Sequence, residues 1–385
     1  MLKISEKTQH LKQSGIRNAS TRCNEIGGIN LGQGVCDIPI VKSIKQSACD
    51  AINNDKSLYS PCEGILELRQ AVAKKLKSYN KISADPATEV VITHGSTGAF
   101  ICAIMTLFNP GDEVILFEPF YGYHKNILNL HNIQVKSVPM SLDDLTFDPE
   151  DVRKAITPKT KGIVICTPCN PSGKVFTQQE LQTLGEIAEK HDLAVITDEI
   201  YEYITYPGYT HVSPASLPIF KPRTITISGF SKTYNMTGWR LGYATGPQHI
   251  ISKMALVQDL VYVCPNTPLQ HAVLAAFDLP DSYFEEMKKT YHVKRDSVVN
   301  TLIELGFKPT VPQGAYYIMA DFSKLKFKDD EQAAQSLLEN SKVATVPGRS
   351  FFIDAKRGEK YIRVCYALNE QKINLAMQQL KVALA

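Results

Sequence analysis

The chain has 385 residues, a length that exceeds the usual limit for one hydrophobic core, so we expect two domains. Hydrophobic residues make up 44% of the chain and charged residues 21%, which is typical of a globular protein and excludes a disordered or fibrous one. The formal net charge of +3 is small and evenly spread, so neither nucleic acid nor a membrane surface is expected as the main partner. A small anionic ligand is compatible with this charge.

The cysteines and the N-terminal residues bear on the compartment. Nine cysteines, scattered and odd in number, do not form a disulfide framework, and we expect most to be small buried hydrophobic residues. The opening MLKISEKTQHLKQSG contains no apolar run of signal-peptide length, and no segment approaches a membrane span. We therefore expect a cytoplasmic protein.

The first part of the chain and the part from residue 89 onward differ in pattern. Residues 1–45 contain the Gly-rich loop LGQGV and are expected to pack with the C-terminal part. From residue 89, short apolar strands alternate with amphipathic helices, as in a parallel sheet built from crossover units. We expect strands at 89–93, 113–117, 162–166, 194–199 and 224–228, and helices at 96–108, 122–131 and 178–191. Residues 46–278 are therefore predicted to form a large α/β domain.

The pattern changes after residue 280. A long charged helix is predicted over 283–305, a strand over 315–322, a helix over 331–340 and a strand over 361–367. Together with residues 1–45, the segment 279–385 is predicted to form a smaller α+β domain.

The most informative segment is SGFSKTYNMTGWRLGY, residues 228–243. Lys232 follows a predicted buried strand in a Ser- and Gly-rich turn, where its amine can be desolvated and can act as a Schiff-base nucleophile. Arg240 supplies a permanently charged fork suited to a phosphate dianion. Taken alone, Lys232 would be interpreted as a surface charge, and it is the surrounding residues that favour the site.

A second segment, AVITDEIY, places Asp198 after an apolar strand at the carboxyl edge of the predicted sheet, where open α/β sheets bind ligands. A buried aspartate needs a partner, and a protonated ring nitrogen would provide one. The alternative for Asp198 is a helix cap, and Glu199 beside it is expected to be structural.

Two further turns lie after predicted strands. The CxxC of CTPCNPSG, residues 166–173, suggests zinc or redox chemistry, but no second cysteine pair completes a tetrahedral site, so we expect no metal. THGSTG, residues 93–98, opens a predicted helix whose backbone N–H groups and dipole favour an anion, with Ser96 and Thr97 as hydroxyl donors. His94 is expected to pack or to cap this helix.

Over nearly its whole length, from LGQG to YIRVCYA, the chain resembles the class I and II aminotransferases of the fold type I pyridoxal-phosphate family. The resemblance implies a mostly parallel seven-stranded sheet between helices, with a smaller α+β domain. It also implies pyridoxal 5'-phosphate as the cofactor, amino acids and 2-oxo acids as substrates, and a homodimer with shared active sites.

The resemblance assigns a role to each matching residue around the cofactor. Lys232 is implied to form the internal aldimine, and Arg240 to bind the phosphate. Asp198 is implied to pair with the pyridine nitrogen, while Asn170 and Tyr201 are implied to donate to the phenolic oxygen. Many relatives carry a phosphate-binding serine where this chain has Gly229, and either Ser228 or Ser231 could replace it.

Four more positions match by resemblance. Tyr121 is implied to lie over the pyridine ring, although a plain core aromatic is the alternative. Tyr59 is implied to reach the partner's phosphate across a dimer interface. Gly34 and Arg363, together with Asn170, are implied to bind the substrate carboxylate, with a strand-edge salt bridge as the alternative for Arg363. The loop at Gly34 departs from the common form by carrying Cys36 where proline is usual.

The resemblance predicts an aminotransferase with ping-pong kinetics, leaning to neutral, aromatic, methionine, glutamine or kynurenine-type substrates. Aspartate is the alternative amino donor. The same anchor residues also serve carbon–sulfur lyases and cyclopropane-forming synthases of this fold, because the pocket selects which bond breaks. A regulator that retains the fold would need a DNA-binding extension ahead of residue 30, and the sequence has no such pattern.

Overall fold

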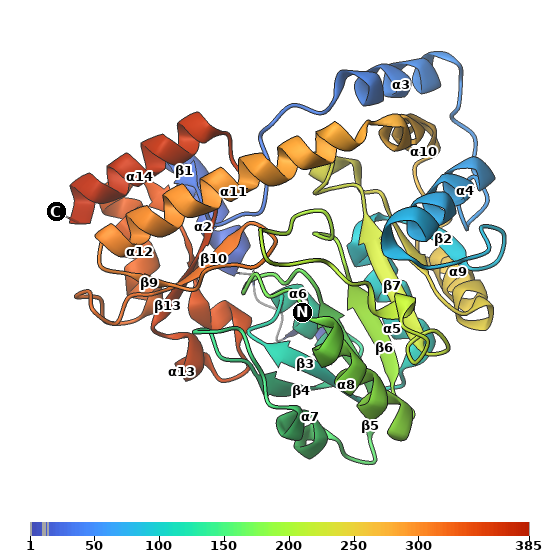
Figure 1. Ribbon diagram of the computed structural model, residues 1–385, viewed down its shortest axis with the longest axis horizontal. Coiled ribbons are helices and arrows are strands. Elements are labelled where there is room, and N and C mark those ends of the chain that lie inside the picture. The colour runs from blue at the N-terminus through green and yellow to red at the C-terminus, as the bar shows by residue number, and fades with distance from the viewer. Residues whose placement is uncertain (1, 10–12, 14, 385) are drawn as a thin grey trace.

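A central sheet organises the larger part of the computed structural model, which describes residues 2–9, 13 and 15–384 (Figure 1). The strands that form the sheet are β2 (Val90–Thr93), β3 (Glu113–Glu118), β4 (Gln134–Pro139), β5 (Thr160–Cys166), β6 (Ala194–Asp198), β7 (Thr224–Gly229) and β8 (Gly242–Thr245). Within the described residues these seven strands are ordered β2-β8-β7-β6-β5-β3-β4. Only β8 runs antiparallel to its neighbours, so the predicted mostly parallel sheet is confirmed.

Helices cover both faces of this sheet, which explains why its inner strands are apolar without alternation. Val195 and Ile196 are adjacent on β6 and point to opposite faces, and each is fully buried in a different hydrophobic cluster. One cluster includes α5 (Gly95–Leu107), α6 (Gly122–Leu130) and α9 (Gln248–Tyr262). The other includes α7 (Pro149–Ala155) and α8 (Gln178–Lys190), the latter begun by a capping box at Thr177 and Glu180.

A third cluster lies at the β2 edge of the sheet. It is formed by helices α4 (Leu66–Lys75) and α10 (Thr267–Val273), with α3 (Lys42–Asn53) packed on α10. A π-helical turn, Leu76–Asn80, continues α4.

The C-terminal part is built on a four-stranded antiparallel sheet. Its strands are β9 (Lys308–Pro309), β10 (Tyr317–Asp321), β12 (Val346–Pro347) and β13 (Tyr361–Cys365), ordered β12-β13-β10-β9. The helices of this part are α11 (Asp281–Glu304), α12 (Asp330–Ser341), α13 (Ala355–Gly358) and α14 (Glu370–Leu384). Figure 1 shows α11 running from these elements toward α10 and the larger part.

The N-terminal residues contact this C-terminal part. Strand β1 (Ile29–Asn30) pairs in parallel with β11 (Val343–Ala344), and α2 (Gly15–Glu25) packs on the same region, while α1 (Glu6–Gln9) precedes it. The domain limits 46–278 and 1–45 with 279–385 stay a prediction. Among the described residues no helix has the length and apolarity needed to cross a bilayer, and the nine cysteines form no disulfide.

The helices and strands expected from the sequence are observed with shifts of a few residues at their ends. Two strands of the large sheet, β4 and β8, were not expected. Strand β4 lies at the edge of the sheet and carries polar residues, and β8 has four residues, so neither shows the long apolar run that marks the inner strands.

Candidate functional site

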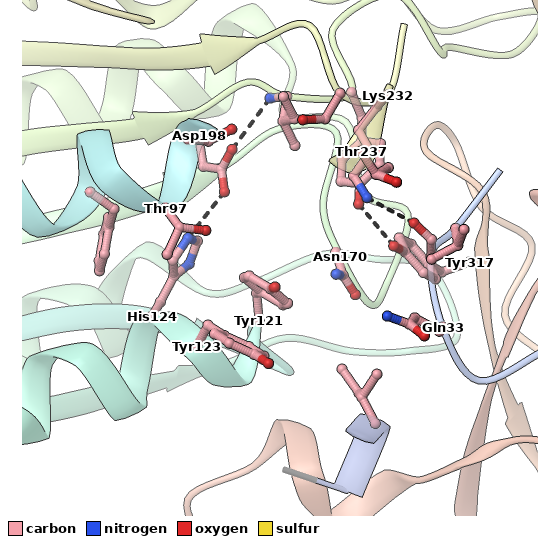
Figure 2. A pocket seen from close by; sticks show the side chains of 18 of the residues that line it. Gln33, Thr97, Tyr121, Tyr123, His124, Asn170, Asp198, Lys232, Thr237 and Tyr317 are labelled. Atoms are coloured by element: carbon pink, nitrogen blue, oxygen red, sulfur yellow. Dashed lines mark hydrogen bonds and ion pairs between the residues drawn. The ribbon is translucent and has the colours of Figure 1, made fainter. Parts of the chain in front are cut away.

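A cavity of about 570 Å³ opens at the carboxyl ends of β5, β6 and β7 (Figure 2). Because these strands are parallel, the residues that follow them meet at one edge of the sheet. All eleven residues singled out from the sequence are among those the structure describes, and ten of them line the cavity. The ten are Gly34, Ser96, Thr97, Tyr121, Asn170, Asp198, Tyr201, Lys232, Arg240 and Arg363.

Lys232 lies three residues beyond the end of β7. Its Nζ donates a hydrogen bond to the carbonyl oxygen of Gly34 at 2.8 Å. Desolvation in the cavity, with a smaller contribution from the charges of Arg240 and Arg363, lowers the pKa of Lys232 from 10.5 to about 8. The amine is therefore partly neutral near neutral pH, as a nucleophile or base requires.

Asp198, the last residue of β6, is 7% exposed and points into the cavity. Its Oδ2 lies 3.1 Å from Nε2 of His124, and its Oδ1 accepts from the backbone N–H of Ile200 at 3.3 Å. His124 is itself buried, with its ring 4.5 Å from that of Phe100. The carboxylate is thus held by two neighbours, which does not support the helix-cap alternative, because the segment after Asp198 is a turn.

The two predicted elements of an anion site meet at one end of the cavity. Ser96 and Thr97 lie in the first turn of α5, where free N–H groups and the helix dipole favour negative charge. The guanidinium of Arg240 lies against Gly95, where a Cβ would come within 2.7 Å of its Nη2. Only a glycine at this left-handed position, with φ +65°, allows so close an approach.

The structure separates the two candidate serines near Lys232. Ser231 lines the cavity, whereas the Ser228 hydroxyl is buried beneath it and donates to Glu202 at 2.8 Å. At Gly229 a Cβ would lie 2.9 Å from the Cα of Gly242, so a serine would require a backbone shift. Ser231 is therefore the serine placed to face an anion.

Arg363, on β13, is fully buried. Its Nη1 donates to Oδ1 of Asn170 at 2.8 Å, and its Nη2 donates to the carbonyl of Gly32. Its Nε has no hydrogen-bond partner among the described residues although it is buried. A buried N–H group without an acceptor destabilises the fold unless a ligand accepts its hydrogen bond. This favours a bound carboxylate over a strand-edge salt bridge for Arg363.

Tyrosines form much of the remaining wall. Tyr121 and Tyr123 stack with ring centroids 5.1 Å apart, and the Tyr121 ring meets His124 edge-on at 5.3 Å. The hydroxyl of Tyr201 lies 2.8 Å from that of Tyr317. Tyr121 thus borders the cavity on the side of Asp198, where a flat ring could stack on it (Figure 2).

Tyr59 is the predicted residue that the structure does not bring to the cavity. Its side chain is 84% exposed, and within the described chain it does not line the cavity. It lies in a surface loop next to Leu58, which is 83% exposed.

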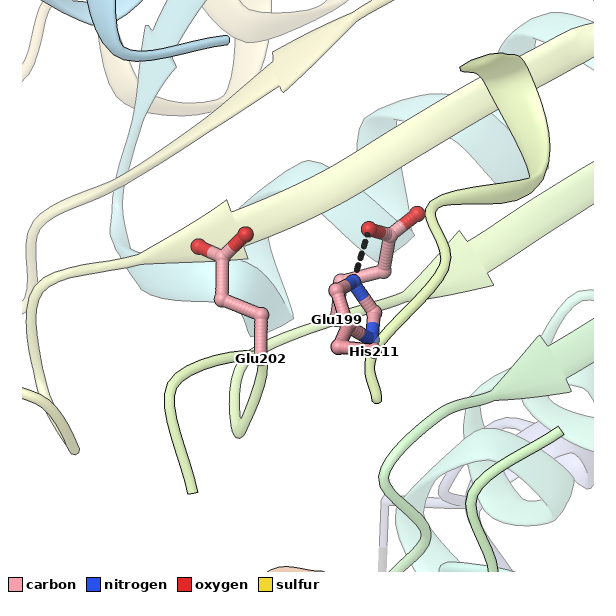
Figure 3. Close-up of side chains that lie close together, drawn as sticks. All are labelled: Glu199, Glu202 and His211. Atoms are coloured by element: carbon pink, nitrogen blue, oxygen red, sulfur yellow. Dashed lines mark hydrogen bonds and ion pairs between the residues drawn. The ribbon is translucent and has the colours of Figure 1, made fainter. Parts of the chain in front are cut away.

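The predicted alternatives outside the cavity can also be placed. Cys166 and Cys169 carry free thiols. The pKa of Cys166 is raised mainly by its hydrogen bond with Cys169 and, to a smaller extent, by burial. Among the described residues the group whose spacing suits a metal ion is instead Glu199, Glu202 and His211 (Figure 3). The ring of His94 stacks on Tyr262 at 4.5 Å, as expected for a packed histidine.

The group formed by Glu199, Glu202 and His211 lies on the other side of β6 from the cavity and is an ion-pair network. Glu202 pairs with the ammonium of Lys75 at 2.5 Å and accepts from Asn80 at 2.7 Å. Burial by itself would raise the pKa of Glu202, but the charges of Lys75 and His211 hold it below its usual value. Glu199 accepts from His211 at 2.8 Å and lies away from the cavity, so both carboxylates of the group have partners without an ion, while Nδ1 of His211 has none among the described residues.

The cavity fits pyridoxal phosphate, the cofactor expected from the sequence. An anion site at α5 and Arg240 lies at one end, a buried carboxylate is available for a ring nitrogen, and Lys232 faces the space between them. The unpartnered Nε of Arg363 is a buried donor that a carboxylate could accept from.

Several residues of the cavity were not singled out from the sequence. They are Ile16, Arg17, Gln33, Val35, Phe100, Tyr123, His124, Ile127, Ile200, Thr237, Gly238 and Tyr317. Arg17 and Ile16 come from α2, whose approach to the sheet edge has no local sequence signal. His124 carried a usable signal, since a histidine beside two tyrosines follows the strand EVILF.

Comparison with known proteins gives consistent matches over most of the chain. The family described as aminotransferase class I and II matches residues 26–380. An aromatic-amino-acid aminotransferase of Thermococcus litoralis is 34% identical, with 99% of this chain and 98% of that protein covered. An aspartate aminotransferase of Pyrococcus abyssi is 36% identical, with 92% and 91% covered. The solved N-succinyldiaminopimelate aminotransferase of Mycobacterium tuberculosis superposes with a TM-score of 0.95 at 31% identity, covering 99% of this chain and 100% of that one.

The pKa of Lys232 leads to a direct test on the cofactor-free protein. Acetic anhydride acylates only neutral amines, so labelling of Lys232 should rise about tenfold per pH unit below the pKa and level off above it. We expect the bend near pH 8, measured by mass spectrometry of the labelled peptide. Labelling of the exposed Lys161 in the same sample corrects for reagent loss. A Lys232 curve that still climbs at pH 10 would contradict the desolvated amine.

Proposed function

The chain belongs to the class I and II aminotransferases, and from this premise we propose that Lys232, Asp198, Asn170, Arg240 and Arg363 carry its reaction on neutral or aromatic amino acids. The enzyme uses pyridoxal 5'-phosphate and transfers amino groups between amino acids and 2-oxo acids. The observation that carries the site assignment is the convergence of these residues, from separate parts of the chain, on one cavity.

The substrate carboxylate is proposed to bind between Arg363 and Asn170. The Arg363 guanidinium is already oriented by its 2.8 Å bond to Asn170, and it keeps a buried donor free. A carboxylate held there by two hydrogen bonds has one orientation, which sets the direction of the Cα–H bond.

When bound, pyridoxal phosphate supplies an electron sink for the bond that breaks at the substrate Cα. Asp198 is proposed to hold the proton on the ring nitrogen, since its carboxylate is buried and His124 fixes its orientation. Arg240, Ser231 and the first turn of α5 are proposed to bind the phosphate.

Lys232 is proposed to carry the proton. Its Nζ is a base with a pKa of about 8 and can move a proton between the substrate Cα and the C4' carbon of the cofactor. Two half-reactions that share one cofactor require ping-pong kinetics.

The walls around the proposed substrate side chain favour neutral or aromatic substrates. Tyr121, Tyr123, Ile16, Val35 and Tyr317 supply apolar or aromatic surface to the cavity. Such a wall binds an aromatic or methionine side chain through contact area and ring stacking. The likeness to the Thermococcus litoralis aromatic-amino-acid aminotransferase supports the same substrate class.

One observation favours aspartate as the second candidate substrate. Arg17, on α2, lines the cavity as a third arginine beside Arg240 and Arg363. A guanidinium there could bind the distal carboxylate of a dicarboxylic substrate. The likeness to the Pyrococcus abyssi aspartate aminotransferase supports this alternative.

We also propose a homodimer in which Tyr59 reaches the partner's phosphate site. The loop carrying Leu58 and Tyr59 lies beside α9, since Gln258 donates to the carbonyl of Cys62 at 2.5 Å. Leu260 on the same helix is 87% exposed, so apolar side chains gather where an interface would form.

The lysine assignment is tested with Lys232→Ala. Phosphate-site contacts remain, so the variant should still bind pyridoxal phosphate, while kcat should fall at least ~10²-fold because the proton carrier is lost. Borohydride should fix the cofactor to the native enzyme and leave it removable from the variant. Lys161→Ala, at the opposite edge of the sheet, is the control and should keep normal turnover. Near-normal turnover by Lys232→Ala would show that another group moves the proton.

The substrate class is tested with Arg17→Gln. We expect the native enzyme to prefer phenylalanine or methionine to aspartate, and the variant to keep that kcat/KM. If aspartate is the true donor, the variant should lose roughly 10–100-fold in kcat/KM for aspartate alone, the effect of one charge-assisted hydrogen bond. Arg22→Gln on the same helix, where the native side chain pairs with Glu25 at the surface, is the matched control.

The dimer is tested by sedimentation. A charge in an apolar interface is costly, so Leu260→Asp should dissociate the native dimer and reduce activity at low protein concentration. Val382→Asp introduces the same charge at a position that is 77% exposed on α14 and should leave the dimer intact. A native protein that sediments as a monomer at all concentrations would contradict the shared site.

A further inference from the structure

Tyr317 lies between a predicted cofactor-binding residue, Tyr201, and the proposed substrate anchor, Arg363. It lies on β10, is 2% exposed and lines the cavity (Figure 2). Its hydroxyl lies 2.8 Å from the hydroxyl of Tyr201, the residue predicted to donate to the cofactor. Its ring lies 4.5 Å from the guanidinium of Arg363, the proposed substrate anchor. One side chain therefore contacts both groups.

The ring of Tyr317 supports Arg363 together with a second aromatic ring. The guanidinium of Arg363 also lies 4.8 Å from the ring of Phe351. The attraction between a cation and an aromatic face is stronger in a buried site than in water, because water no longer competes for the cation. The orientation of the guanidinium thus depends on a ring that carries a hydroxyl on its far end.

Gly34 leaves the space that this hydroxyl occupies. A Cβ at position 34 would lie 1.9 Å from the hydroxyl oxygen of Tyr317 and 2.9 Å from its Cζ. The carbonyl of the same glycine accepts the 2.8 Å hydrogen bond from Lys232. The glycine that the sequence assigned to substrate binding is therefore also needed for the close approach of Tyr317.

The hydroxyls of Tyr201 and Tyr317 share one hydrogen bond, which uses only one of their two hydrogens. Burial raises the pKa of both Tyr201 and Tyr317, so both keep their protons at neutral pH. If Tyr317 donates to Tyr201, the hydrogen of Tyr201 is free to point to an acceptor in the cavity. Without the Tyr317 hydroxyl nothing in this pair sets that direction.

We propose that Tyr317 is a positioning residue whose hydroxyl makes Tyr201 donate into the cavity and whose ring holds Arg363 in place for the substrate carboxylate. The proposal rests on the function proposed above. It separates two roles of one side chain: the hydroxyl can be removed alone, and comparison with a variant that also lacks the ring isolates the role of the ring.

Tyr317→Phe removes the hydroxyl and keeps the ring. With pyridoxal phosphate bound, a hydrogen-bond donor on the cofactor's phenolic oxygen would make that oxygen less basic and so favour loss of a proton from the neighbouring Lys232 nitrogen. Loss of an aimed donor should therefore shift the pH titration of the cofactor's visible absorption band upward by ~0.5–1 unit and lower kcat by roughly 2–10-fold. Binding of 3-phenylpropionate, a carboxylate without an amino group, should change less than about twofold, since the ring remains.

Tyr317→Leu removes the ring as well. The dissociation constant of 3-phenylpropionate should then rise by roughly 3–30-fold, because Arg363 loses its aromatic support. Tyr201→Phe should reproduce the band shift. Tyr201→Phe combined with Tyr317→Phe should add nothing further, because the Tyr317 hydroxyl acts through the Tyr201 donor that is already absent.

Tyr366→Phe is the matched control. It breaks a buried pair of tyrosine hydroxyls, Tyr366 and Tyr206 at 2.7 Å, outside the cavity. We expect no band shift from it. If Tyr366→Phe shifts the band as much as Tyr317→Phe, the effect is structural and the proposal is overturned.

Other outcomes separate this proposal from the one on which it rests. A native enzyme that transaminates and shows a normal band, with no shift in Tyr317→Phe, overturns the role of Tyr317 alone. A native protein with neither band nor turnover overturns the proposed function and this proposal with it. If Tyr317→Phe does not fold, as judged by circular dichroism, Gly34→Ala takes its place, because its Cβ must displace the same hydroxyl. An unshifted band in that variant overturns the proposal.

Discussion

The parallel pairing of β5, β6 and β7 is the constraint on which the site depends. Cys166 lies opposite Asp198, and Asp198 opposite Ile227, so the turns that follow the three strands begin at the same level of the sheet. Those turns carry Asn170, Tyr201 and Lys232, which are far apart in the sequence but are brought together by the pairing of the strands. A slip of one residue in any pair would turn Asp198 to the other face, where Glu199 now lies in its ion-pair network.

The charges of the cavity follow from what these turns expose. Positive charge comes from Arg17, Lys232, Arg240 and Arg363, and Asp198 is the carboxylate among the lining residues described. Such a cavity suits ligands with several negative groups. Desolvation in the cavity is the main cause of the lowered pKa of Lys232, and the charges of Arg240 and Arg363 lower it further. The arginines that would attract a phosphate and a carboxylate therefore also help the lysine to lose its proton.

Much of this could be predicted from the sequence, because strong local signals mark it. The inner strands are continuous apolar runs, and the residues that match the family lie directly after them. The rest depends on contacts between distant segments. In the sequence Tyr317 resembles any other apolar strand residue, and Arg17 lies on α2, which is placed by contacts with the distant strands β11 and β12. The choice between Ser228 and Ser231 required the direction of each hydroxyl, which no motif records.

The two neighbouring acids at the end of β6 have different roles because they point to opposite faces of the sheet. Successive residues of a strand point to opposite faces, so Asp198 reaches the cavity while Glu199 meets His211 on the other side. Glu202 in the same turn binds Lys75 and the hydroxyl of Ser228, four residues before Lys232. The turn that presents Asp198 and the segment that presents Lys232 are therefore tied together by buried hydrogen bonds. Because a buried carboxylate left without its donors is costly, this network resists any movement of one segment relative to the other.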